Sequence, residues 1–399
     1  MPRVLGTHRP GVRLYYLRSV WVGSMRISEG NEGQRGRRGQ YLGSEGGGAA
    51  GQRGQYPIQL PIFDDPKPEP TSWAMLDERR RGTAFLQLPT RTVLNPPAST
   101  GMGFWSLNPY VGCEFGCSYC YARDAHRYQL ERAADQVPEA SPPLPAWQAF
   151  EQRILVKSDA AATLAHTLDP AKLAGQTLVI GTATDPYQPA ERTFGLTRQI
   201  LETLLSHRGY SIGIITKSPL VARDIDVLQQ LSQRHDVSIN ISLISANARL
   251  VRRLERRSPI PKTRLTALGK LTAAGLNAGI MMAPILPGLT DDRRGLEAMM
   301  RSAKAAGARY VIGIPLRLDP VSRRRFWPTL QQEFPHLVER YRRCYGPRSY
   351  AKKAYISALI RRVRQLQQQY GFPVQSDRRQ RRTTVASQRP GVGEQMALL

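Results

Sequence analysis

The sequence predicts an α/β fold in which strands alternate with helices along the central part of the chain. Six short apolar runs recur between residues 105 and 315, and a segment of helical periodicity follows each of them. Continuous apolar strands separated by helices are typical of a parallel sheet whose faces are covered by helices. Six such units suit a partial (β/α)6 barrel of the TIM type, in which functional side chains gather at the carboxyl ends of the strands.

The strands predicted for this barrel are apolar runs bounded by Gly, Pro or polar residues. They cover residues 105–112, 177–183, 210–216, 237–244, 277–284 and 309–315. The helices have apolar residues three and four positions apart, and they cover residues 119–131, 147–168, 192–207, 220–234, 248–256, 261–274 and 291–306. A Pro/Ala-rich insert at residues 137–145 separates the first strand–helix unit from the rest.

The two ends of the chain depart from this pattern. Residues 1–80 are rich in Gly, Arg and Pro and lack the apolar content that would offset the entropy of ordering, so we expect disorder there. The Gly/Arg tract in this region is compatible with loose RNA binding, or with a start codon placed upstream of the true one. After a core domain at residues 100–320, residues 321–375 predict a basic helical extension with helices at 322–344 and 349–370. Residues 376–399 are expected to form a disordered tail.

Three of the four cysteines lie within eight residues, in the stretch Cys113-Glu-Phe-Gly-Cys117-Ser-Tyr-Cys120. Thiolates are the ligands of iron–sulfur clusters, and three of them can hold a cube of four irons while one iron stays open for chemistry. Gly112 and Gly116 allow the backbone to wrap closely around such a cluster. We therefore predict Cys113, Cys117 and Cys120 as ligands of a [4Fe–4S] cluster.

Zinc is the alternative occupant of this loop. His126 follows Cys120 by six positions and would complete a Cys3His tetrahedron, so a zinc-containing nucleic-acid-binding protein is the non-enzymatic alternative. A zinc site gives no reason for the aromatic residue at Tyr119 or for the strand–helix repeat that follows. Cys344 lies far from the trio, among arginines on a predicted amphipathic helix, and we interpret it as incidental.

Charge and hydropathy indicate the expected binding partner and cellular location of the protein. The net charge of +26 and the isoelectric point near 10.5 favour a polyanionic partner, of which nucleic acid is the first candidate. Solvation of basic chain ends is the alternative explanation of the charge. The sequence contains no apolar run of about 20 residues, so no membrane span is expected. We also expect no secretory signal and a cytoplasmic location, which suits an oxygen-sensitive cluster.

Several separate motifs together resemble the radical SAM superfamily, and within it the spore photoproduct lyase-like branch, also called DNA repair photolyase-like. The resemblance covers roughly residues 100–345 and is carried by Asn108-Pro-Tyr-Val-Gly-Cys113, Ser118-Tyr-Cys-Tyr-Ala-Arg123, Gly181-Thr-Ala-Thr-Asp-Pro-Tyr-Gln-Pro-Ala-Glu191, Ile215-Thr-Lys-Ser218 and Met282-Ala-Pro284. It implies a [4Fe–4S] cluster whose free iron binds S-adenosylmethionine. It also implies reductive cleavage to a 5′-deoxyadenosyl radical that abstracts hydrogen from a substrate, and an electron donor such as flavodoxin or ferredoxin.

The resemblance assigns roles to side chains at the strand ends. It implies that Tyr119 lies beside the adenine and that Thr184 and Asp185 meet the amino group of S-adenosylmethionine. It further implies that Lys217 pairs with the carboxylate, with Ser242 as a weaker candidate for a polar contact. A zwitterion needs both an acceptor and a cation, which suits an aspartate and a lysine. The alternatives are an ordinary turn capped by Asp185 and a solvated surface position for Lys217.

The spore photoproduct lyase-like branch also implies what the reaction is. Tyr119 and Tyr121 keep the tyrosine pair that flanks the last cluster cysteine, so we predict both as catalytic. The hydrogen-donating cysteine of that branch is missing, because the stretch 182–184 reads Thr-Ala-Thr. We therefore do not expect strict thymine-dimer repair unless Cys344 folds over the barrel mouth. The predicted function is a lyase- or repair-like radical SAM enzyme acting on nucleic acid, and the enzymatic alternative is modification of a peptide or small molecule.

Overall fold

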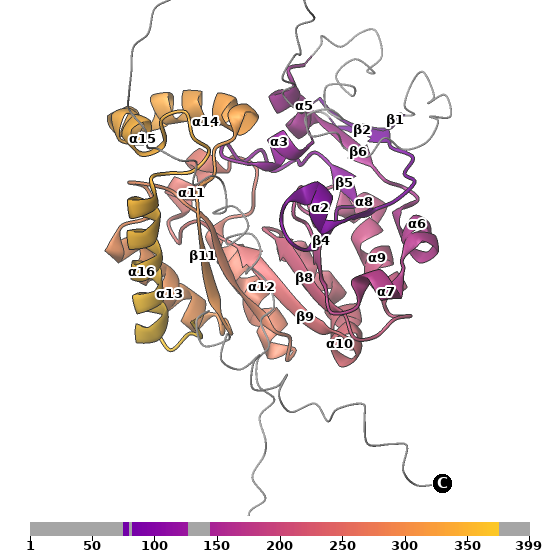
Figure 1. The fold of residues 1–399 in the computed structure, drawn as a ribbon. Helices are drawn as coiled ribbons and strands as arrows, with labels where there is room; N and C mark the ends of the chain where they lie inside the picture. The colour runs from indigo at the N-terminus through magenta and orange to yellow at the C-terminus, as the bar shows by residue number, and fades with distance from the viewer. Residues whose placement is uncertain (1–74, 80–81, 127–143, 375–399) are drawn as a thin grey trace, which may run out of the picture.

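A parallel-rich sheet of seven strands forms the centre of the protein (Figure 1). The computed structural model describes residues 75–79, 82–126 and 144–374. The strand order is β11-β10-β9-β8-β7-β4-β3, and every neighbouring pair except β3 with β4 is parallel. The strands are β3 (Leu94–Asn95), β4 (Trp105–Leu107), β7 (Thr177–Ile180), β8 (Ser211–Thr216), β9 (Asp236–Ser242), β10 (Ala278–Ile285) and β11 (Val311–Pro315).

This sheet confirms the predicted α/β class. The six parallel strands follow one another in chain order across the sheet, as expected for a partial barrel. Side chains alternate between its two faces, because successive residues of a strand point to opposite sides. Ile212, Ile214 and Ile280 pack outward beneath the helices, whereas Val179 and Met281 belong to a smaller inner cluster.

A second sheet, which the sequence did not predict, supports the cysteine loop. Its order is β1-β2-β6-β5, with β1 (Met75–Arg79), β2 (Thr83–Gln87), β6 (Arg153–Val156) and β5 (Tyr110–Val111). The predicted helix over 147–168 is wrong at β6, which separates α5 (Ala146–Gln152) from α6 (Ala160–Thr167). A short apolar run such as Ile-Leu-Val suits either element, and pairing with the distant β2 decides in favour of a strand.

The remaining helices cover the sheet and close its carboxyl end. They are α2 (Pro97–Thr100), α3 (Ala122–Ala125), α7 (Pro170–Leu173), α8 (Glu191–Phe194), α9 (Leu196–Leu204), α10 (Ile225–Arg234), α11 (Ala248–Leu254), α12 (Pro261–Ala273), α13 (Arg293–Ala305), α14 (Pro320–Glu333), α15 (Val338–Tyr345) and α16 (Lys353–Gln369), with the 3-10 helices η2 (Pro219–Asp224) and η3 (Pro335–Leu337). None of the helices in the described ranges combines the length and the apolar character needed to cross a membrane.

Several predicted helix boundaries need correction. The predicted helix 192–207 is divided at Gly195, whose left-handed φ of 62° ends α8. The predicted helix 220–234 begins as the 3-10 turn η2. The predicted helix 322–344 is interrupted before Pro335, because the residue that precedes a proline avoids the helical conformation. The helix predicted at 119–131 starts only at Ala122, and its part beyond residue 126 lies outside the described residues.

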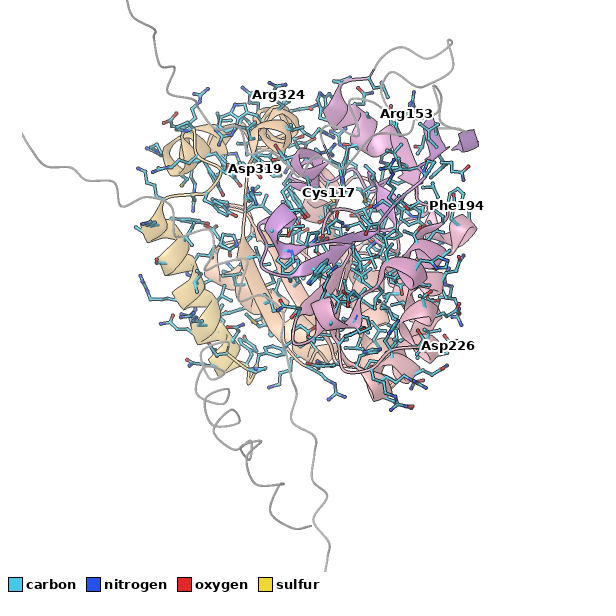
Figure 2. The ribbon with its side chains drawn as sticks, turned by 45° about the vertical axis from the view of Figure 1, so that its right-hand side comes forward. Cys117, Arg153, Phe194, Asp226, Asp319 and Arg324 are labelled. Atoms are coloured by element: carbon cyan, nitrogen blue, oxygen red, sulfur yellow. The ribbon has the colours of Figure 1, made fainter. Side chains whose placement is uncertain are left out.

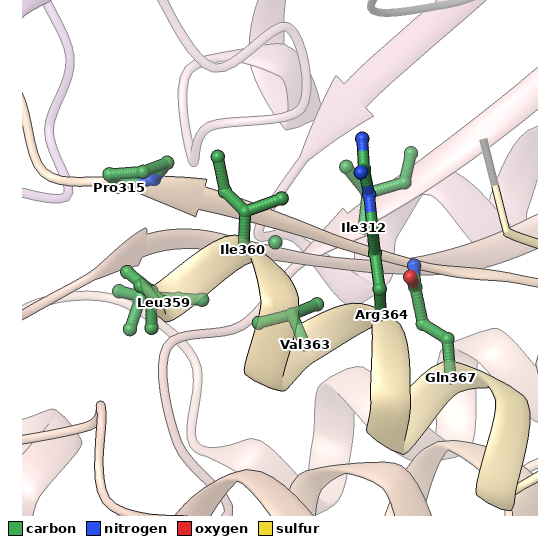
Figure 3. A pocket seen from close by; sticks show the side chains of 9 residues that line it. Ile312, Pro315, Leu359, Ile360, Val363, Arg364 and Gln367 are labelled. Atoms are coloured by element: carbon green, nitrogen blue, oxygen red, sulfur yellow. The ribbon is translucent and has the colours of Figure 1, made fainter. Parts of the chain in front are cut away.

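The C-terminal helices pack directly against the barrel. Helix α16 lies along α13 and the edge strand β11, where the Gln367 amide donates to the Val311 carbonyl at 2.7 Å. A small pocket between this helix and the strand is lined by Ile312, Leu359 and Val363 (Figure 3). The described part of the predicted extension thus packs against the core, and β2 and β3 lie before residue 100, where the core was predicted to begin. The predicted disordered regions lie outside the described residues, apart from Met75–Arg79, which form β1.

Helices α14 and α15 also contact the cysteine loop. Phe326 and Tyr341 share one apolar cluster with Cys113 and Cys117. The first backbone N–H groups of α14 donate to the Asp124 carboxylate of α3 at 2.8 and 2.9 Å. A carboxylate at a helix N-terminus is stabilising because it accepts unpaired N–H groups and complements the helix dipole. This contact ties the C-terminal helices to the loop.

Substitution of Gly279 tests the packing inside the barrel. A Cβ atom at Gly279 would lie 2.5 Å from both Cε2 and the carbonyl oxygen of the buried Tyr310. We expect Gly279→Ala to lower the free energy of unfolding by roughly 1–3 kcal/mol, because neither atom can move away easily. The control is Gly269→Ala on α12, where the nearest atom is 3.7 Å away. Equal stability of the two variants in urea denaturation would contradict the packing described.

Candidate active site

The loop between β5 and α3 carries the three predicted cysteines. Cys113 and Cys117 are buried, Cys120 is half-buried, and all three thiols are free. Burial raises the pKa of Cys113, and the neighbouring Asp185 and Cys117 raise it further. Burial likewise raises the pKa of Cys117 to about 12, although Lys217 opposes the shift. A metal centre supplies the positive charge that buried thiolates require.

The donor set of this loop fits an iron–sulfur cluster better than a single ion. Across the described ranges, no three His, Cys, Asp or Glu side chains are placed so that they could hold one metal ion. The zinc tetrahedron with His126 is therefore not formed. In a cluster of four irons each cysteine binds a different iron, so the sulfurs need not converge on one point. The [4Fe–4S] prediction is compatible with this arrangement.

Glycines let the loop approach its surroundings closely. A Cβ at Gly112 would lie 2.9 Å from the Phe150 carbonyl oxygen, and one at Gly116 would lie 2.6 Å from the Glu151 carboxylate. Both glycines have positive φ, 86° and 60° respectively. This backbone conformation favours glycine. The atoms that a Cβ would meet at both positions belong to the protein itself, so these glycines let the loop pack closely against α5.

Backbone hydrogen bonds attach the loop to three separate elements. The Cys113 N–H donates to the Phe150 carbonyl at 2.8 Å. The Glu114 N–H donates to the Gln188 side chain at 2.9 Å, and the Ser118 N–H donates to the Leu254 carbonyl at 2.9 Å. The loop has little regular structure of its own, so these contacts with α5, the β7–α8 segment and α11 determine its conformation.

Arg123 is a functional candidate that the sequence analysis quoted but did not assign. Its side chain is fully buried, and it donates to the Cys117 carbonyl at 3.0 Å and to Glu151 at 2.6 Å. Glu151 also pairs with Arg257 at 2.6 Å and Arg325 at 3.2 Å. The three arginines come from α3, the segment after α11 and α14, and all of them pair with the Glu151 carboxylate.

The predicted pair at the end of β7 makes contacts within the protein. The Thr184 hydroxyl donates to the Gly112 carbonyl at 2.5 Å. The Asp185 carboxylate accepts from the Thr216 hydroxyl at 2.6 Å and from the Lys217 N–H at 2.7 Å. It also accepts from the Tyr187 N–H at 3.0 Å, which is the turn contact considered from the sequence. Both residues therefore join the cysteine loop and β8 to the end of β7.

Lys217, Ser242 and Tyr119 lie together, as their predicted roles require. The Lys217 ammonium donates to the Ser242 hydroxyl at 3.2 Å and lies 5.9 Å from the centre of the Tyr119 ring. Burial lowers the pKa of Lys217, but Cys117 and Glu255 outweigh this effect and raise it overall. The lysine is half-buried, so the alternative of a solvated surface position is wrong.

The two predicted catalytic tyrosines have different partners. The Tyr119 hydroxyl donates to the Glu255 carboxylate, whereas the half-buried Tyr121 donates to the Thr182 carbonyl at the end of β7. Arg317, which follows β11, lies close enough to Tyr121 to influence its pKa, which burial raises. The guanidinium of Arg317 also lies 5.6 Å from the centre of the Tyr350 ring. Tyr121 is thus held at the end of β7 with Arg317 nearby, and Tyr119 contacts the residue that follows α11.

A buried ion pair beneath the loop escaped the sequence analysis. Glu255 and Arg264 are both fully buried and pair with each other. Burial opposes ionisation of Glu255, but Arg264 and then Lys217 outweigh it and lower its pKa to about 2. The only signal in the sequence was one glutamate within the arginine-rich run 249–257. Cys344 lies half-buried on α15, against the apolar cluster that contains the cysteine loop.

Comparison with known proteins agrees with this geometry. Residues 107–297 match the family model described as the radical SAM superfamily. An uncharacterised protein of Mycobacterium tuberculosis is 33% identical over 291 residues, which cover 72% of this chain and 82% of that protein. An uncharacterised protein of Methanocaldococcus jannaschii is 24% identical over 255 residues, which cover 64% of this chain and 85% of that protein.

Solved structures share the fold at low sequence identity. A spore photoproduct lyase variant with bound AdoMet and dinucleoside spore photoproduct has a TM-score of 0.51 and is 16% identical, covering 72% of this chain and 79% of that chain. Spore photoproduct lyase complexed with dinucleoside spore photoproduct gives the same values. The matching family model, the similarity to the mycobacterial protein and the loop of three free cysteines lead to one conclusion: this chain belongs to the radical SAM superfamily.

Proposed function

We propose that the protein is an enzyme that uses a [4Fe–4S] cluster and S-adenosylmethionine to start radical chemistry on nucleic acid, in a lyase- or repair-like reaction. The observation that carries the proposal is the cysteine loop beside Lys217 at the end of β8. Three free thiols and a half-buried cation lie together there. A cytoplasmic location and an electron donor such as flavodoxin or ferredoxin are part of the same proposal.

Some residues of the site would bind the cluster, and others would orient S-adenosylmethionine. When bound, the cluster and S-adenosylmethionine would supply reductive cleavage of the sulfonium bond and hydrogen abstraction from the substrate. Cys113, Cys117 and Cys120 would each hold one iron. The Lys217 ammonium would receive the carboxylate of S-adenosylmethionine through a charge-assisted hydrogen bond. Asp185 would act on Lys217 indirectly, because it holds the Lys217 backbone N–H.

A basic rim beside the cysteine loop supports nucleic acid as the substrate class. Helices α11, α14 and α15 carry exposed arginines at positions 249, 252, 253, 324, 340, 342 and 343, and the exposed Arg256 follows α11. Arg253 pairs with Glu333 at 2.7 Å and so joins α11 to the end of α14. Figure 2 shows Arg324 and Cys117 toward the same end of the molecule. Clustered arginines attract phosphates by charge and by bidentate hydrogen bonds.

The proposed reaction would differ from the thymine-dimer repair in which a cysteine returns the hydrogen atom. The end of β7 carries Thr182 and Thr184 in place of a thiol. The Thr182 hydroxyl shares a hydrogen bond with Ser106 at 2.5 Å and accepts one from Asn108 at 3.3 Å. A hydroxyl O–H bond is too strong to return a hydrogen atom easily to a carbon radical. We therefore propose a lyase- or repair-like reaction on nucleic acid in which Thr182 and Thr184 do not return a hydrogen atom to the substrate radical.

Iron retention tests the cluster ligands. We expect Cys117→Ala to lose most of its iron and its brown colour after anaerobic reconstitution, because one iron would lack its thiolate. The matched control is Cys344→Ala, which removes the fourth cysteine and should keep the iron content of the wild type. The measurements are iron and sulfide content and the visible absorption spectrum. Full iron retention in Cys117→Ala would refute the proposed ligand set.

Salt-dependent binding tests the nucleic-acid substrate. We expect the triple variant Arg249→Gln, Arg324→Gln, Arg343→Gln to bind DNA or RNA more weakly. The slope of log K against log salt should fall by about 2–3, close to one for each phosphate that the variant no longer neutralises. Fluorescence anisotropy over a salt series measures both effects.

The control for this test is a second triple variant that also loses three positive charges, here near the amino ends of the strands. It replaces the exposed Arg208, Arg234 and Lys270 by Gln. Equal binding by both triple variants would exclude the rim as the contact surface. Salt-independent binding, or none, would favour the alternative of radical modification of a peptide or small molecule.

A further inference from the structure

We propose that Glu255 is a positioning residue which, through Arg264, holds Tyr119, Lys217 and Ser242 in place relative to the cysteine loop. This inference rests on the proposed function, because those three residues are among the ones expected to meet S-adenosylmethionine. Glu255 itself is buried beneath the loop and would not touch the cofactor. Its role is to fix the residues that do.

The backbone of Glu255 is tied to the middle cysteine. Glu255 and Cys117 form an isolated antiparallel β-bridge just after the end of α11. The adjacent Leu254 carbonyl accepts from both the Ser118 N–H at 2.9 Å and the Ser118 hydroxyl at 3.1 Å. The backbone of residues 254–255 therefore pairs with the cysteine loop as a short strand would. A shift of the loop would move the Glu255 side chain with it.

The Glu255 carboxylate accepts hydrogen bonds from three side chains. One oxygen accepts from the Tyr119 hydroxyl, and the other accepts from Arg264 and, at 2.7 Å, from the Ser258 hydroxyl. Tyr119 is buried, so its ring orientation is set by packing and by this one hydroxyl contact. The carboxylate thus links the aromatic residue between the last two cysteines to a guanidinium on α12.

Arg264 extends the link to the strand ends. Its three nitrogens donate to the Pro259 carbonyl at 2.8 Å, to the Ser242 carbonyl at 2.8 Å, and to Glu255 and Ser258. The Ser242 hydroxyl in turn accepts from the Lys217 ammonium at 3.2 Å. Because Lys217 lies over the Tyr119 ring, the contacts form a closed circuit. It runs from the cysteine loop through Glu255, Arg264, Ser242 and Lys217 back to Tyr119.

The energetics of burial favour a positioning role. A buried ion pair is seldom a net source of stability, because each charge loses its hydration, and well-packed apolar residues often serve as well. Its directional hydrogen bonds, however, restrict where each partner can lie. The Glu255–Arg264 pair joins residues from α11, α12, β8 and β9 that no local sequence contact connects. We therefore infer that the Glu255–Arg264 pair keeps these residues in their relative positions.

The experiment removes the hydroxyl link without removing the ring. Tyr119→Phe, in the anaerobically reconstituted full-length protein, should keep the wild-type iron content, and its melting temperature should fall no further than that of the matched control Tyr110→Phe. We expect its Kd for S-adenosylmethionine to rise about 10-fold, since a charge-assisted hydrogen bond no longer orients the ring. The change that S-adenosylmethionine induces in the EPR spectrum of the reduced cluster should also diminish.

The chain offers a matched control. Tyr110 donates to the fully buried Glu191 at 2.6 Å, and Arg223 pairs with the same carboxylate at 3.1 Å. Tyr110→Phe therefore breaks the same kind of tyrosine–glutamate–arginine contact away from Lys217 and Ser242. It should leave the Kd for S-adenosylmethionine and the EPR change as in the wild type. An equal rise of the Kd in both variants would overturn the assignment, since it would indicate a general effect of weaker packing.

A double variant tests whether both residues act through one bond. Glu255→Gln should weaken S-adenosylmethionine binding at least as much as Tyr119→Phe, and the double variant should bind no more weakly than Glu255→Gln alone. Additive effects on the binding free energy would contradict the link. Where Glu255→Gln fails to fold, Tyr119→Phe decides the matter by itself. A wild type that holds iron but binds no S-adenosylmethionine would refute the proposed function, whereas normal wild-type binding with an unchanged Tyr119→Phe would refute only this inference.

Discussion

The conformation of the cysteine loop depends on hydrogen bonds that other elements make to its backbone. Between β5 and the four-residue α3 the chain has no regular structure that could hold three thiols in place. Residues from α5, the β7–α8 segment and the end of α11 supply acceptors to the backbone N–H groups of Cys113, Glu114 and Ser118. Each partner is itself attached to a strand or helix of the barrel, so the barrel determines the loop geometry.

Buried charge around this loop is balanced residue by residue. Arg123 is paired with Glu151, and Arg264 with Glu255, while the backbone N–H of Lys217 is held by Asp185. Removing charges from water is costly, and pairing with good hydrogen-bond geometry offsets much of that cost. Each of the two arginines thus carries its own counter-ion, whereas the Lys217 ammonium donates to the Ser242 hydroxyl.

The C-terminal helices pack against both the sheet edge and the cysteine loop. Helix α16 covers the edge strand β11, which would otherwise present unpaired backbone groups to other chains. Helices α14 and α15 share an apolar cluster with the cysteine loop and are attached to it through Asp124. Arginines 324, 340, 342 and 343 of these two helices are exposed.

The sequence by itself determined the alternation of strands and helices and the identity of the three cysteines, because both are patterns of neighbouring residues. The resemblance of its motifs to a known family further indicated Lys217, Thr184 and Asp185, which follow two predicted strands of the sheet. Only the tertiary structure revealed that β2, β6 and β5 pair in one sheet, that three arginines pair with Glu151, and that Glu255 pairs with Arg264. These contacts join residues as far apart as Arg325 and Glu151, and local periodicity carries no information on which distant segments will pack together.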